Sequence, residues 1–521
     1  MLFRSSLSPI ELANSRALAT AESGTARPST WNPGQKPNDI YFDNLWGLKA
    51  IDAEGAWKKA TGKNVVVAVI DTGLDASHPD LRGASYVNGY DFVEGLPLYA
   101  AYKDDWPESI SIPHGTHVAG TIGAVANNGY GITGVAPNVK LMPIRVLNEN
   151  GSGYFTDIAA GIEWAANKGA KVANLSLGGV GAGPSDYQWL AENLGPSIGV
   201  AASKGMAVVA ASGNDEFNES WSPYTTWPAA DPRVIRVAAF GLDAETTDSY
   251  HQAWFSTAAA NVTVTAPGEE VLSTLSPRGY AHWAGTSMAT PHVSGVVALM
   301  KSINGALTPG QLRAYLKMGA IDTPDSFDDY EAWSDYNQEG PDDGSGAGML
   351  NAAASVNAAA AKRVVVDVAT ADPRTPQITD AGGYALAIST NAANAKCVIT
   401  ASLYTTPVEA VYYFPPLGWG FPGSLDYPRE LLSEAPLSGT SCGTRSVTLE
   451  SLNAAFADAG QDPIPGNDGS LSAVFTVRVG AASAASLPIP VFPPDTSAPE
   501  VVADSTVGGP YSVDYIRTVE A

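Results

Sequence analysis

Four polar residues, each at the end of an expected strand or helix, have the chemical types that a serine-based catalytic site needs. Asp71 follows the apolar run "NVVVAVI" (64–70), and Ser287 lies at the head of an expected helix in "GTSMATPHVSG". His114 lies in "HGTHVAG", and Asn214 lies in the turn "AASGND". A serine hydroxyl becomes nucleophilic when a histidine takes its proton, and a buried carboxylate holds that histidine in one tautomer. A side-chain amide and a helix N-terminus can stabilise the oxyanion that forms.

Each of these residues has a commoner structural role when it is taken alone. An aspartate that closes a strand usually caps a turn or helix, and a serine before a helix is usually an N-cap. An asparagine beside glycine is usually a loop residue that tolerates left-handed geometry. Four such residues together favour a shared cleft. Pro291 is expected within about the first turn of the helix that Ser287 begins, where a missing N–H costs little.

The two histidines of "PHGTHVAGT" (113–121) allow three interpretations. His114 and His117 are three residues apart, so on a helix they could face one side and bind zinc. One could instead be a catalytic base beside a structural neighbour, or both could be core residues. The helical zinc-peptidase motif places Glu beside the first His and the second His four residues on. Because Gly115 and a spacing of three depart from that motif, we expect His114 to be the base and His117 to be structural. The other histidines, which have no ligand pattern, are His78, His251, His282 and His292.

The segments that carry these residues alternate between buried strands and a helix. Continuous apolar runs are typical of strands in a parallel sheet that is covered on both faces. A run with helical periodicity and a glycine stop lies between two of them. Such alternation predicts a doubly wound, mostly parallel α/β sheet with helices on both faces and a site at the carboxyl ends of the strands. The expected strands are 64–70, 139–147, 170–177 and 206–212, and the expected helix is 156–169.

The length of 521 residues predicts more than one domain. We expect an N-terminal arm or linker over 1–38, the α/β domain over 39–361 and a Pro/Ser-rich, loosely ordered tail over 491–521. Short Val, Thr and Tyr runs between Pro and Gly turns predict a smaller β-rich accessory domain over 362–490.

The charge balance limits the partners of the protein. Fifty-three acidic against 29 basic residues give a net charge of −24. This argues against nucleic acid or anionic membranes as partners, because both require clustered Lys and Arg. No run of the sequence is long enough to be a membrane span. The acidic stretch 324–346 is expected to be a solvated loop, with a cation site as the alternative. The aromatic stretch 411–421 is expected to pack as core and turns, with an exposed binding surface as the alternative.

The cysteines and the N-terminus point to different compartments. Cys397 and Cys442 are the only cysteines, which favours one disulfide in an oxidising compartment over two free thiols. The first twenty residues lack the apolar core of a secretory signal. We expect a secreted, extracellular protein whose recorded start lies downstream of the true one.

Three longer stretches resemble the subtilisin-like serine proteases: "VVAVIDTGLDASHPDL", "HGTHVAGTIGA" and "AGTSMATPHVSGVVAL". The order Asp, His, Ser is also that of this family, and the resemblance covers about residues 39–361. It implies that Asp71 orients the base, that His114 is the general base and acid, and that Ser287 is the nucleophile. Asn214 and the backbone N–H of Ser287 would stabilise the oxyanion. The implied function is hydrolysis of peptide bonds in proteins or peptides through an acyl-enzyme intermediate, by an expected monomer.

The resemblance also assigns the substrate-binding residues. The segments "SLGG" and "ASGN" would form two walls of the primary specificity pocket, with Thr226 at its floor. The backbone of "GSGYF" would pair with the peptide as an added strand, which gives affinity without sequence choice. Because the walls are apolar, we expect a preference for large apolar side chains before the cleaved bond. The implied residues are Gly151, Gly153, Phe155, Ile158, Ser176, Leu177, Gly178, Ala211, Ser212 and Gly213.

Structural calcium (Ca²⁺) is the cofactor that the resemblance implies, with no catalytic metal. The segment "PNDIYF" (37–42) is similar to the N-terminal segment of the thermitase branch, and "VANNGYGI" (125–132) is similar to the calcium loop of the family. Carboxylate, amide and carbonyl oxygens are the hard ligands that calcium prefers. A plain turn loop is the alternative. The implied ligands are the side chains of Asp39, Asp80 and Asn128 and the carbonyl groups of Ala126, Tyr130 and Ile132.

Three alternative hypotheses for the function each conflict with a feature of the sequence. Intracellular subtilisins are acidic and lack a signal, but they also lack a C-terminal accessory domain with paired cysteines. A metal-dependent hydrolase would need the zinc spacing that His114 and His117 do not have. A non-enzymatic binding scaffold would need a lost catalytic group, and all four groups are present. An inhibitory pro-segment is expected from the resemblance but is not visible before residue 39.

Overall fold

The structure, a computed structural model, describes two compact units of the 521-residue chain. The first unit runs to Arg363 and includes Arg517–Ala521, and the second spans Val364–Ile516. Within the described residues, no helix combines the length and the apolar character needed to cross a membrane. The described residues are 31–99, 113–215, 224–242, 250–259, 261–322, 344–370, 378–379, 384–405, 431–437, 442–461, 464, 471–485, 489–492 and 518–520.

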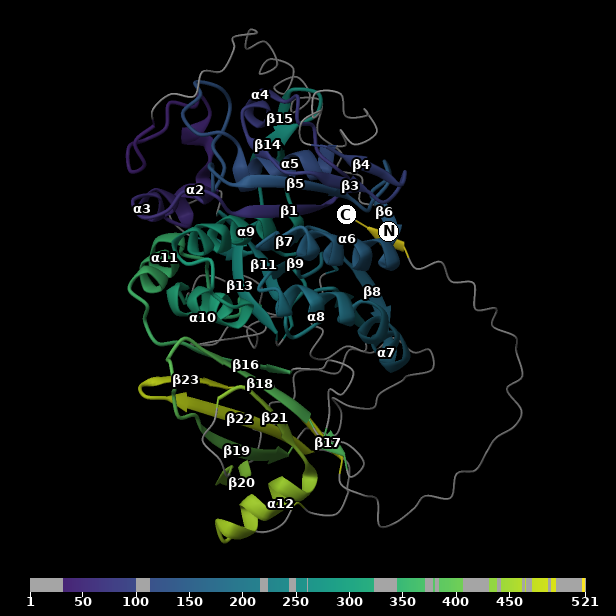
Figure 1. The fold of residues 1–521 in the computed structure, drawn as a ribbon, viewed down its shortest axis with the longest axis vertical. Helices are drawn as coiled ribbons and strands as arrows, with labels where there is room; N and C mark the ends of the chain where they lie inside the picture. Colours follow the sequence, from purple (N-terminus) through teal and green to yellow (C-terminus); the bar gives the residue numbers. More distant parts are fainter. Residues whose placement is uncertain are drawn as a thin grey trace, which may run out of the picture. The chain divides into compact units, whose positions relative to one another are not determined.

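The first unit is built on a ten-stranded sheet whose central strands are parallel. The order of its main path is β12-β11-β9-β7-β1-β5-β3-β4, with β13 paired to β11 and β2 paired to β5 (Figure 1). Only β12 and β4 pair antiparallel with their neighbours in this sheet. The strands are β1 (Val66–Asp71), β2 (Ser85–Tyr86), β3 (Gly89–Asp91), β4 (Leu96–Leu98), β5 (Lys140–Arg145), β7 (Val172–Leu175), β9 (Ala207–Ala211), β11 (Ile235–Leu242), β12 (Tyr250–Gln252) and β13 (Val262–Pro267).

Strand β1 lies at the point where the strand order reverses. It pairs in parallel with β5 on one side and with β7 on the other, and both of these follow it in the chain. In open α/β sheets, a crevice forms at the carboxyl ends of the strands where the order reverses in this way. Asp71 is the last residue of β1, so the topology places its carboxylate at that crevice.

Helices cover both faces of the sheet (Figure 1). Helix α9 (Thr286–Ile303) packs on β7, β9, β11 and β13 and contacts α5 (Pro113–Gly123). Helix α6 (Phe155–Asn167) packs on β1 and β5, and α8 (Gly195–Ser203) packs on β9 and α6. Because side chains alternate across a strand, Ala68 and Ile70 of β1 share one core cluster with Ile158 and Ile162 of α6. This architecture confirms the predicted doubly wound fold class.

The predicted elements agree with the structure to within about two residues at most ends. The expected strands correspond to β1, β5, β7 and β9, and the expected helix corresponds to α6. Further helices of this unit are η1 (Phe42–Asn44), α2 (Trp46–Ala50), α3 (Ala53–Trp57), α4 (Pro79–Arg82), α7 (Gly183–Asn193), α10 (Pro309–Gly319) and α11 (Ala352–Ala360). Its two-stranded sheets are β8 (Gly179–Ala182) with β10 (Tyr224–Trp227), β14 (Val271–Leu275) with β15 (Gly279–Trp283), and β6 (Ser152–Tyr154) with β25 (Thr518–Glu520).

The second unit is rich in β-strands and carries one helix among its described residues, α12 (Leu449–Asp458). Its core contains Leu386, Ile399, Phe456 and Phe475, which are almost fully buried. One sheet contains β16 (Val366–Thr370), β18 (Tyr384–Thr390) and β21 (Thr444–Val447). The other contains β17 (Ile378–Thr379), β19 (Val398–Thr405), β20 (Leu431–Pro436), β22 (Leu471–Val479), β23 (Ala482–Ala485) and β24 (Ile489–Phe492).

The two cysteines of the second unit form a disulfide, as the sequence favoured. Cys397 immediately precedes β19 and Cys442 lies just before β21, and their Cα atoms are 5.3 Å apart. The bond therefore links the segments that lead into one strand of each sheet. The aromatic stretch 411–421, most of the acidic stretch 324–346 and residues 1–30 of the N-terminal arm lie outside the described residues.

Candidate active site

A buried aspartate and a histidine form a hydrogen-bonded pair at the carboxyl end of β1. Nδ1 of His114 lies 2.8 Å from Oδ1 of Asp71, whose side chain is fully buried. The same carboxylate oxygen accepts the backbone N–H of Thr72 at 2.7 Å. With its Nδ1–H donated to the carboxylate, the imidazole of His114 keeps Nε2 as the proton acceptor. Its side chain is 16% exposed, so the ring borders solvent.

The position of Gly115 explains how this pair comes so close. A Cβ atom at Gly115 would lie 1.9 Å from the backbone oxygen of Gly73 and 3.0 Å from Oδ1 of Asp71. Any larger residue would push the start of α5 away from the end of β1. The glycine therefore sets the distance between the histidine that precedes it and the carboxylate.

Ser287 is held by two reciprocal hydrogen bonds to Ser176. The Oγ–H of Ser287 donates to the carbonyl oxygen of Ser176 at 3.0 Å, and the Oγ–H of Ser176 donates to the carbonyl oxygen of Ser287 at 2.7 Å. Oγ of Ser176 also accepts from Asn174 Nδ2 at 3.0 Å, and Asn174 accepts from Ser294 at 2.8 Å. The serine at the head of α9 is thus tied through side chains to the segment that follows β7.

Pro291 lies deeper in α9 than the sequence predicted. Helix α9 begins at Thr286, so Pro291 is its sixth residue and not a first-turn residue. The backbone N–H that proline lacks would have bonded the carbonyl of Ser287, four residues earlier. That carbonyl is the one that accepts from Ser176. The prediction of a first-turn proline was wrong, and the helix tolerates Pro291 because Ser176 supplies a replacement donor.

Two hydrogen-bond donors converge beside the N-terminus of α9. A Cβ atom built on Gly285 would lie 3.6 Å from Nδ2 of Asn214 and 3.7 Å from the backbone N of Ser287. Oδ1 of Asn214 accepts from the N–H and the Oγ–H of Thr286, both at 2.9 Å. Because these bonds occupy the oxygen of the amide, Nδ2 is the end of Asn214 that faces the shared point. Two donors a few ångströms from one point are what an oxyanion requires.

The two expected pocket walls face one another across Thr226. A Cβ atom at Gly178 would lie 2.8 Å from Cγ2 of Thr226, and one at Gly213 would lie 2.9 Å from its Oγ1. Gly213 has a φ of +116°, which favours glycine. Ser176, Leu177, Ala211 and Ser212 are buried, so the walls present mainly backbone.

The expected strand-pairing segment is an irregular edge strand. Gly153 of β6 bridges Leu147, and the N–H of Asn148 bonds the carbonyl of Ser152. Gly151 has a φ of +75° and closes this turn. Phe155 and Ile158 are 5% and 0% exposed and belong to the core under α6. Both side chains pack in the core next to this segment, so little of their surface is available to a ligand.

His117 is occupied by structural contacts. Its Nε2 lies 3.0 Å and 3.1 Å from the carbonyl oxygens of Val271 and Ala281, so Nε2 carries the proton. Its ring stacks on Trp283 with 4.8 Å between centroids, and His114 lies 6.1 Å from the same indole. Burial lowers the pKa of His117 to about 3, which keeps the ring neutral. Its donor nitrogen thus bonds a carbonyl of each strand of the β14–β15 hairpin.

The expected calcium residues gather near α4 and the loop after α5. Oxygens of Asp80 accept from Asn128 Nδ2 at 2.9 Å, from the N–H of Ile132 at 2.7 Å and from the Tyr280 hydroxyl at 2.9 Å. Asp39 accepts from the N–H of Asn128 at 3.0 Å. Burial raises the pKa of Asp39 and raises that of Asp80 to about 6, with Asp39 adding to the shift of Asp80.

These residues fit a hard cation in donor chemistry. Two buried carboxylates lie in one cluster, and the leading influence on both is a desolvation that disfavours their charged forms. A divalent cation would stabilise those forms. In the part of the chain that the structure describes, no three His, Cys, Asp or Glu side chains form a metal-binding group. Calcium here would therefore rely on the carbonyls of Ala126, Tyr130 and Ile132 and on Asn128.

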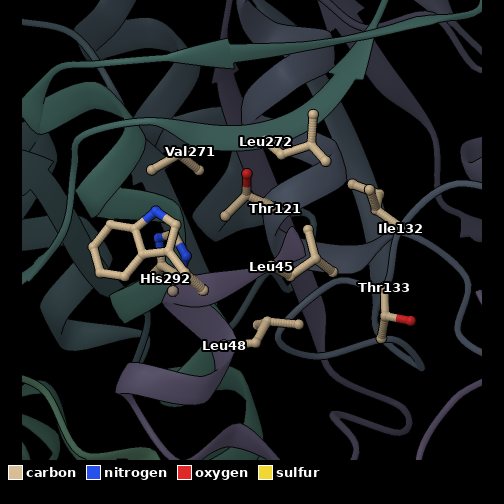
Figure 2. A pocket seen from close by; sticks show the side chains of 10 residues that line it. Leu45, Leu48, Thr121, Ile132, Thr133, Val271, Leu272 and His292 are labelled. Carbon is tan, nitrogen blue, oxygen red and sulfur yellow. The ribbon is translucent and has the colours of Figure 1, made fainter. Parts of the chain in front are cut away.

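A small apolar pocket lies elsewhere in the first unit. Figure 2 shows Leu45 and Leu48 facing Val271 and Leu272 of β14, with His292 of α9 on one side. Nδ1 of His292 bonds the Met288 carbonyl at 2.9 Å, within the same helix. None of the predicted catalytic residues lines this pocket, so it is not the candidate active site.

Sequence reasoning missed two residues that support the site. Thr286 orients the Asn214 amide, and its place beside Ser287 in "GTS" was the available signal. Arg236 is fully buried in β11 and donates to both the hydroxyl and the carbonyl of Ser212 at 2.8 Å. A further bond from Arg236, at 3.0 Å, goes to Asn261. A lone arginine in the apolar run "VIRVAAF" was the signal for a buried polar contact.

The order Asp, His, Ser along a doubly wound sheet distinguishes one class of serine peptidase from the α/β-hydrolases, in which the order is Ser, Asp, His. Here the carboxylate ends β1, the imidazole begins α5 and the hydroxyl begins α9. The family model described as the Subtilase family matches residues 62–348, more than half of the chain. The chain belongs to the subtilase family of serine endopeptidases.

Individual relatives agree with this assignment. Over 364 residues, 38% are identical to an extracellular protease of Xanthomonas campestris pv. campestris, covering 62% of this chain and 57% of that protein. Over 267 residues, 40% are identical to thermitase of Thermoactinomyces vulgaris, covering 51% of this chain and 85% of thermitase. A solved protease structure from Pseudoalteromonas arctica PAMC 21717 is similar with a TM-score of 0.50 and 32% identity, covering 62% of this chain and 100% of that one. The alignment thus spans little more than half of the Xanthomonas protein.

Proposed function

We propose that this protein is an extracellular endopeptidase that cleaves proteins through a Ser287–His114–Asp71 triad. Nε2 of His114 takes the proton of Ser287 Oγ as the oxygen attacks the peptide carbonyl, and Asp71 stabilises the imidazolium. Asn214 Nδ2 and the N–H of Ser287 bind the oxyanion. His114 then gives the proton to the leaving amine, and water hydrolyses the acyl-enzyme by the same route. The supporting observation is the 2.8 Å bond between His114 and Asp71.

In this structure the hydroxyl of Ser287 points to the Ser176 carbonyl. Hydrogen bonds to a catalytic base often tighten only when substrate is bound. Attack therefore requires a rotation of χ1 of Ser287, which exchanges one acceptor for another. The backbone of Ser287 stays fixed during that rotation, because its carbonyl is bonded to Ser176.

The test of this proposal is peptide hydrolysis by the wild type and by Ser287→Ala, with and without a serine-directed inhibitor and with and without a chelator. We expect Ser287→Ala to lose at least about 10³-fold in kcat, as loss of a nucleophile does. His114→Ala should cost turnover more than stability, and His117→Ala should cost stability more than turnover. Hydrolysis that survives Ser287→Ala, or that is lost to chelator without inhibitor sensitivity, would contradict the proposed mechanism.

We propose that the peptide binds as a strand beside Gly151 and Gly153, with its leading side chain between Ser176–Gly178 and Ala211–Gly213. Apolar and backbone walls favour apolar side chains over Lys or Arg, and the expected preference is for large ones. Thr226 limits the depth of this pocket, because it lies against both glycine walls. Mapping of cleavage products by mass spectrometry tests the preference. Products that end mainly in basic residues would contradict it.

We propose structural calcium bound by Asp39, Asp80, Asn128 and the carbonyls of Ala126, Tyr130 and Ile132. Chelator should then lower the melting temperature of the wild type, and Asp80→Asn should remove that response. Asp43→Asn is a matched control, because Asp43 lies on the same segment as Asp39, is 80% exposed and pairs with Lys36. A melting temperature that chelator leaves unchanged would contradict the calcium site.

We propose that the protein works as a monomer outside the cell. The disulfide Cys397–Cys442 is the type of bond that persists in oxidising compartments. The Xanthomonas relative is named an extracellular protease. Detection of the disulfide-bonded chain in culture medium, at a monomer's mass by light scattering, tests both statements.

A further inference from the structure

The C-terminal strand of the described chain lies on the segment that we assign to peptide binding. β25 pairs antiparallel with β6, with Thr518 opposite Tyr154, Val519 opposite Gly153 and Glu520 opposite Ser152. Figure 1 shows this strand, in yellow, beside β6. β25 also lies against β8, which continues from the pocket wall Ser176–Gly178. The residues Arg517–Ala521 belong to the first unit, whereas the chain just before them belongs to the second.

β25 pairs with backbone N–H and C=O groups of β6 that no other described strand hydrogen-bonds. One edge of β6 is taken by its own turn, through the Leu147–Gly153 bridge. β6 is not part of the ten-stranded sheet, and β25 is its only partner strand in the described chain. An extended peptide substrate would pair with the same edge. A substrate bound in this way would need the same row of N–H and C=O groups that β25 occupies.

The sequence of this segment suits strand addition. Pro510 is the last proline, and the run "YSVDYIRTVE" (511–520) that follows is rich in aromatic and β-branched residues. Composition predicted a loosely ordered tail over 491–521, and β25 shows that this tail contains a paired strand. Large apolar side chains remain exposed on both neighbouring strands, since Tyr154 is 51% and Val180 is 48% exposed.

We propose that residues 518–520 are an intramolecular peptide ligand of the β6 edge. These residues compete with peptide substrates for the part of the cleft that binds the residues before the cleaved bond. The proposal rests on the proposed function, in which β6 binds substrate. Because the segment is tethered, its binding is intramolecular and its effective concentration is on the order of 1 mM. With an intrinsic dissociation constant of about 0.1–0.5 mM for so short a strand, the apparent KM rises about three- to tenfold.

The first test compares hydrolysis of a short chromogenic peptide by the full chain and by Val519→Pro/Glu520→Pro. Proline removes the N–H that a strand donates, and adjacent prolines disrupt pairing whichever residue faces β6. We expect KM to fall about three- to tenfold with kcat unchanged. Ser505→Pro, in the same tail but outside β25, is the control and should behave as wild type. A chain ending at Arg517 should match the double variant.

The second test does not depend on catalysis. In the Ser287→Ala background, hydrogen exchange of the β6 amides is compared between the full chain and Val519→Pro/Glu520→Pro. Exchange at residues 152–154 should speed up by about the factor by which KM falls. A synthetic peptide of residues 511–521, added to the chain that ends at Arg517, should restore the protection and inhibit competitively.

Outcomes separate this inference from the proposed function. Unchanged KM and unchanged exchange of β6 in the double variant would overturn the inference and leave the peptidase proposal standing. Faster exchange with no change in KM would also overturn it, because β25 would then bind without competing. If no form of the protein hydrolyses peptides, the proposed function fails, and exchange with the added peptide still decides whether β6 binds this segment.

Discussion

The hydroxyl of Thr286 offers a direct test of how Asn214, the proposed oxyanion donor, is positioned. Its single proton lies within reach of Oδ1 of Asn214, 2.9 Å from Oγ1, and of the Gly213 carbonyl oxygen, 3.2 Å away, and Oγ1 accepts from the N–H of Gly213 at 3.2 Å. Thr286→Val keeps the shape of the side chain and removes every one of these hydroxyl contacts. The N–H of Thr286 still holds the Asn214 oxygen at 2.9 Å, so the amide loses one of two restraints.

The lost hydrogen bond is worth about 1–1.5 kcal/mol. If that free energy is lost from the transition state, kcat should fall about 5- to 13-fold. The fall in kcat should not exceed the fall caused by removing the donor itself, which is about 10²–10³-fold in another subtilase. KM should stay nearly constant, because the oxyanion forms only in the transition state. The assay is steady-state hydrolysis of a chromogenic peptide at saturating and limiting concentrations, alongside thermal unfolding.

Thr290→Val is the matched control for this experiment. Thr290 is also fully buried on α9, and its hydroxyl bonds the Thr286 carbonyl at 2.8 Å without contact to Asn214. Both variants should lose a similar amount of stability, but only Thr286→Val should lose turnover. Equal losses of kcat in the two variants, or a raised KM at constant kcat for Thr286→Val, would refute the reasoning.

Three further predictions follow from buried groups. Burial holds the pKa of His292 at about 4, below its unfolded value of 6.5, so the unfolded chain binds more protons below pH 6.5 and stability falls as pH drops. Urea unfolding at pH 7.5 and 5.5 should show that His292→Asn loses about 1.4 kcal/mol less than wild type over this range, and equal losses would contradict this. Cys397→Ser/Cys442→Ser should destabilise the second unit by about 2–4 kcal/mol, seen in denaturant unfolding, with kcat unaffected, whereas a large fall in kcat would contradict this. Thr226→Gly should deepen the pocket and raise kcat/KM for Phe relative to Ala before the cleaved bond about tenfold, and an unchanged ratio would place Thr226 outside the pocket.

Local patterns were sufficient to predict the fold class and the main elements. The run that became β1 is apolar throughout because both faces of the sheet are covered, and such runs have few alternative structures. The polar residues that follow these runs marked the carboxyl edge, where Asp71 ends β1 and Asn214 follows β9. Hydrogen bonds to Asp71 and to Ser176, which follows β7, bring His114 and Ser287 to the same edge. Cys397 and Cys442 were the only possible pair within the chain.

Contacts between segments far apart in the sequence were not available from local pattern. Pro291 was placed in a first turn because nothing local shows that Ser176, 111 residues from Ser287, donates to the freed carbonyl. The bonds from Arg236 to Ser212 likewise depend on β11 lying beside β9. The pairing of β25 with β6 joins residues more than 360 positions apart, and composition alone suggested a loose tail there.

The sequence by itself determined which chemistry is possible, because residue types and their place at element ends are local properties. Only the tertiary structure decided which nitrogen of His114 faces Asp71, which end of the Asn214 amide points outward, and which strand borders β6. The physical reason is that orientation depends on donors and acceptors supplied by other elements, and long-range packing brings these together.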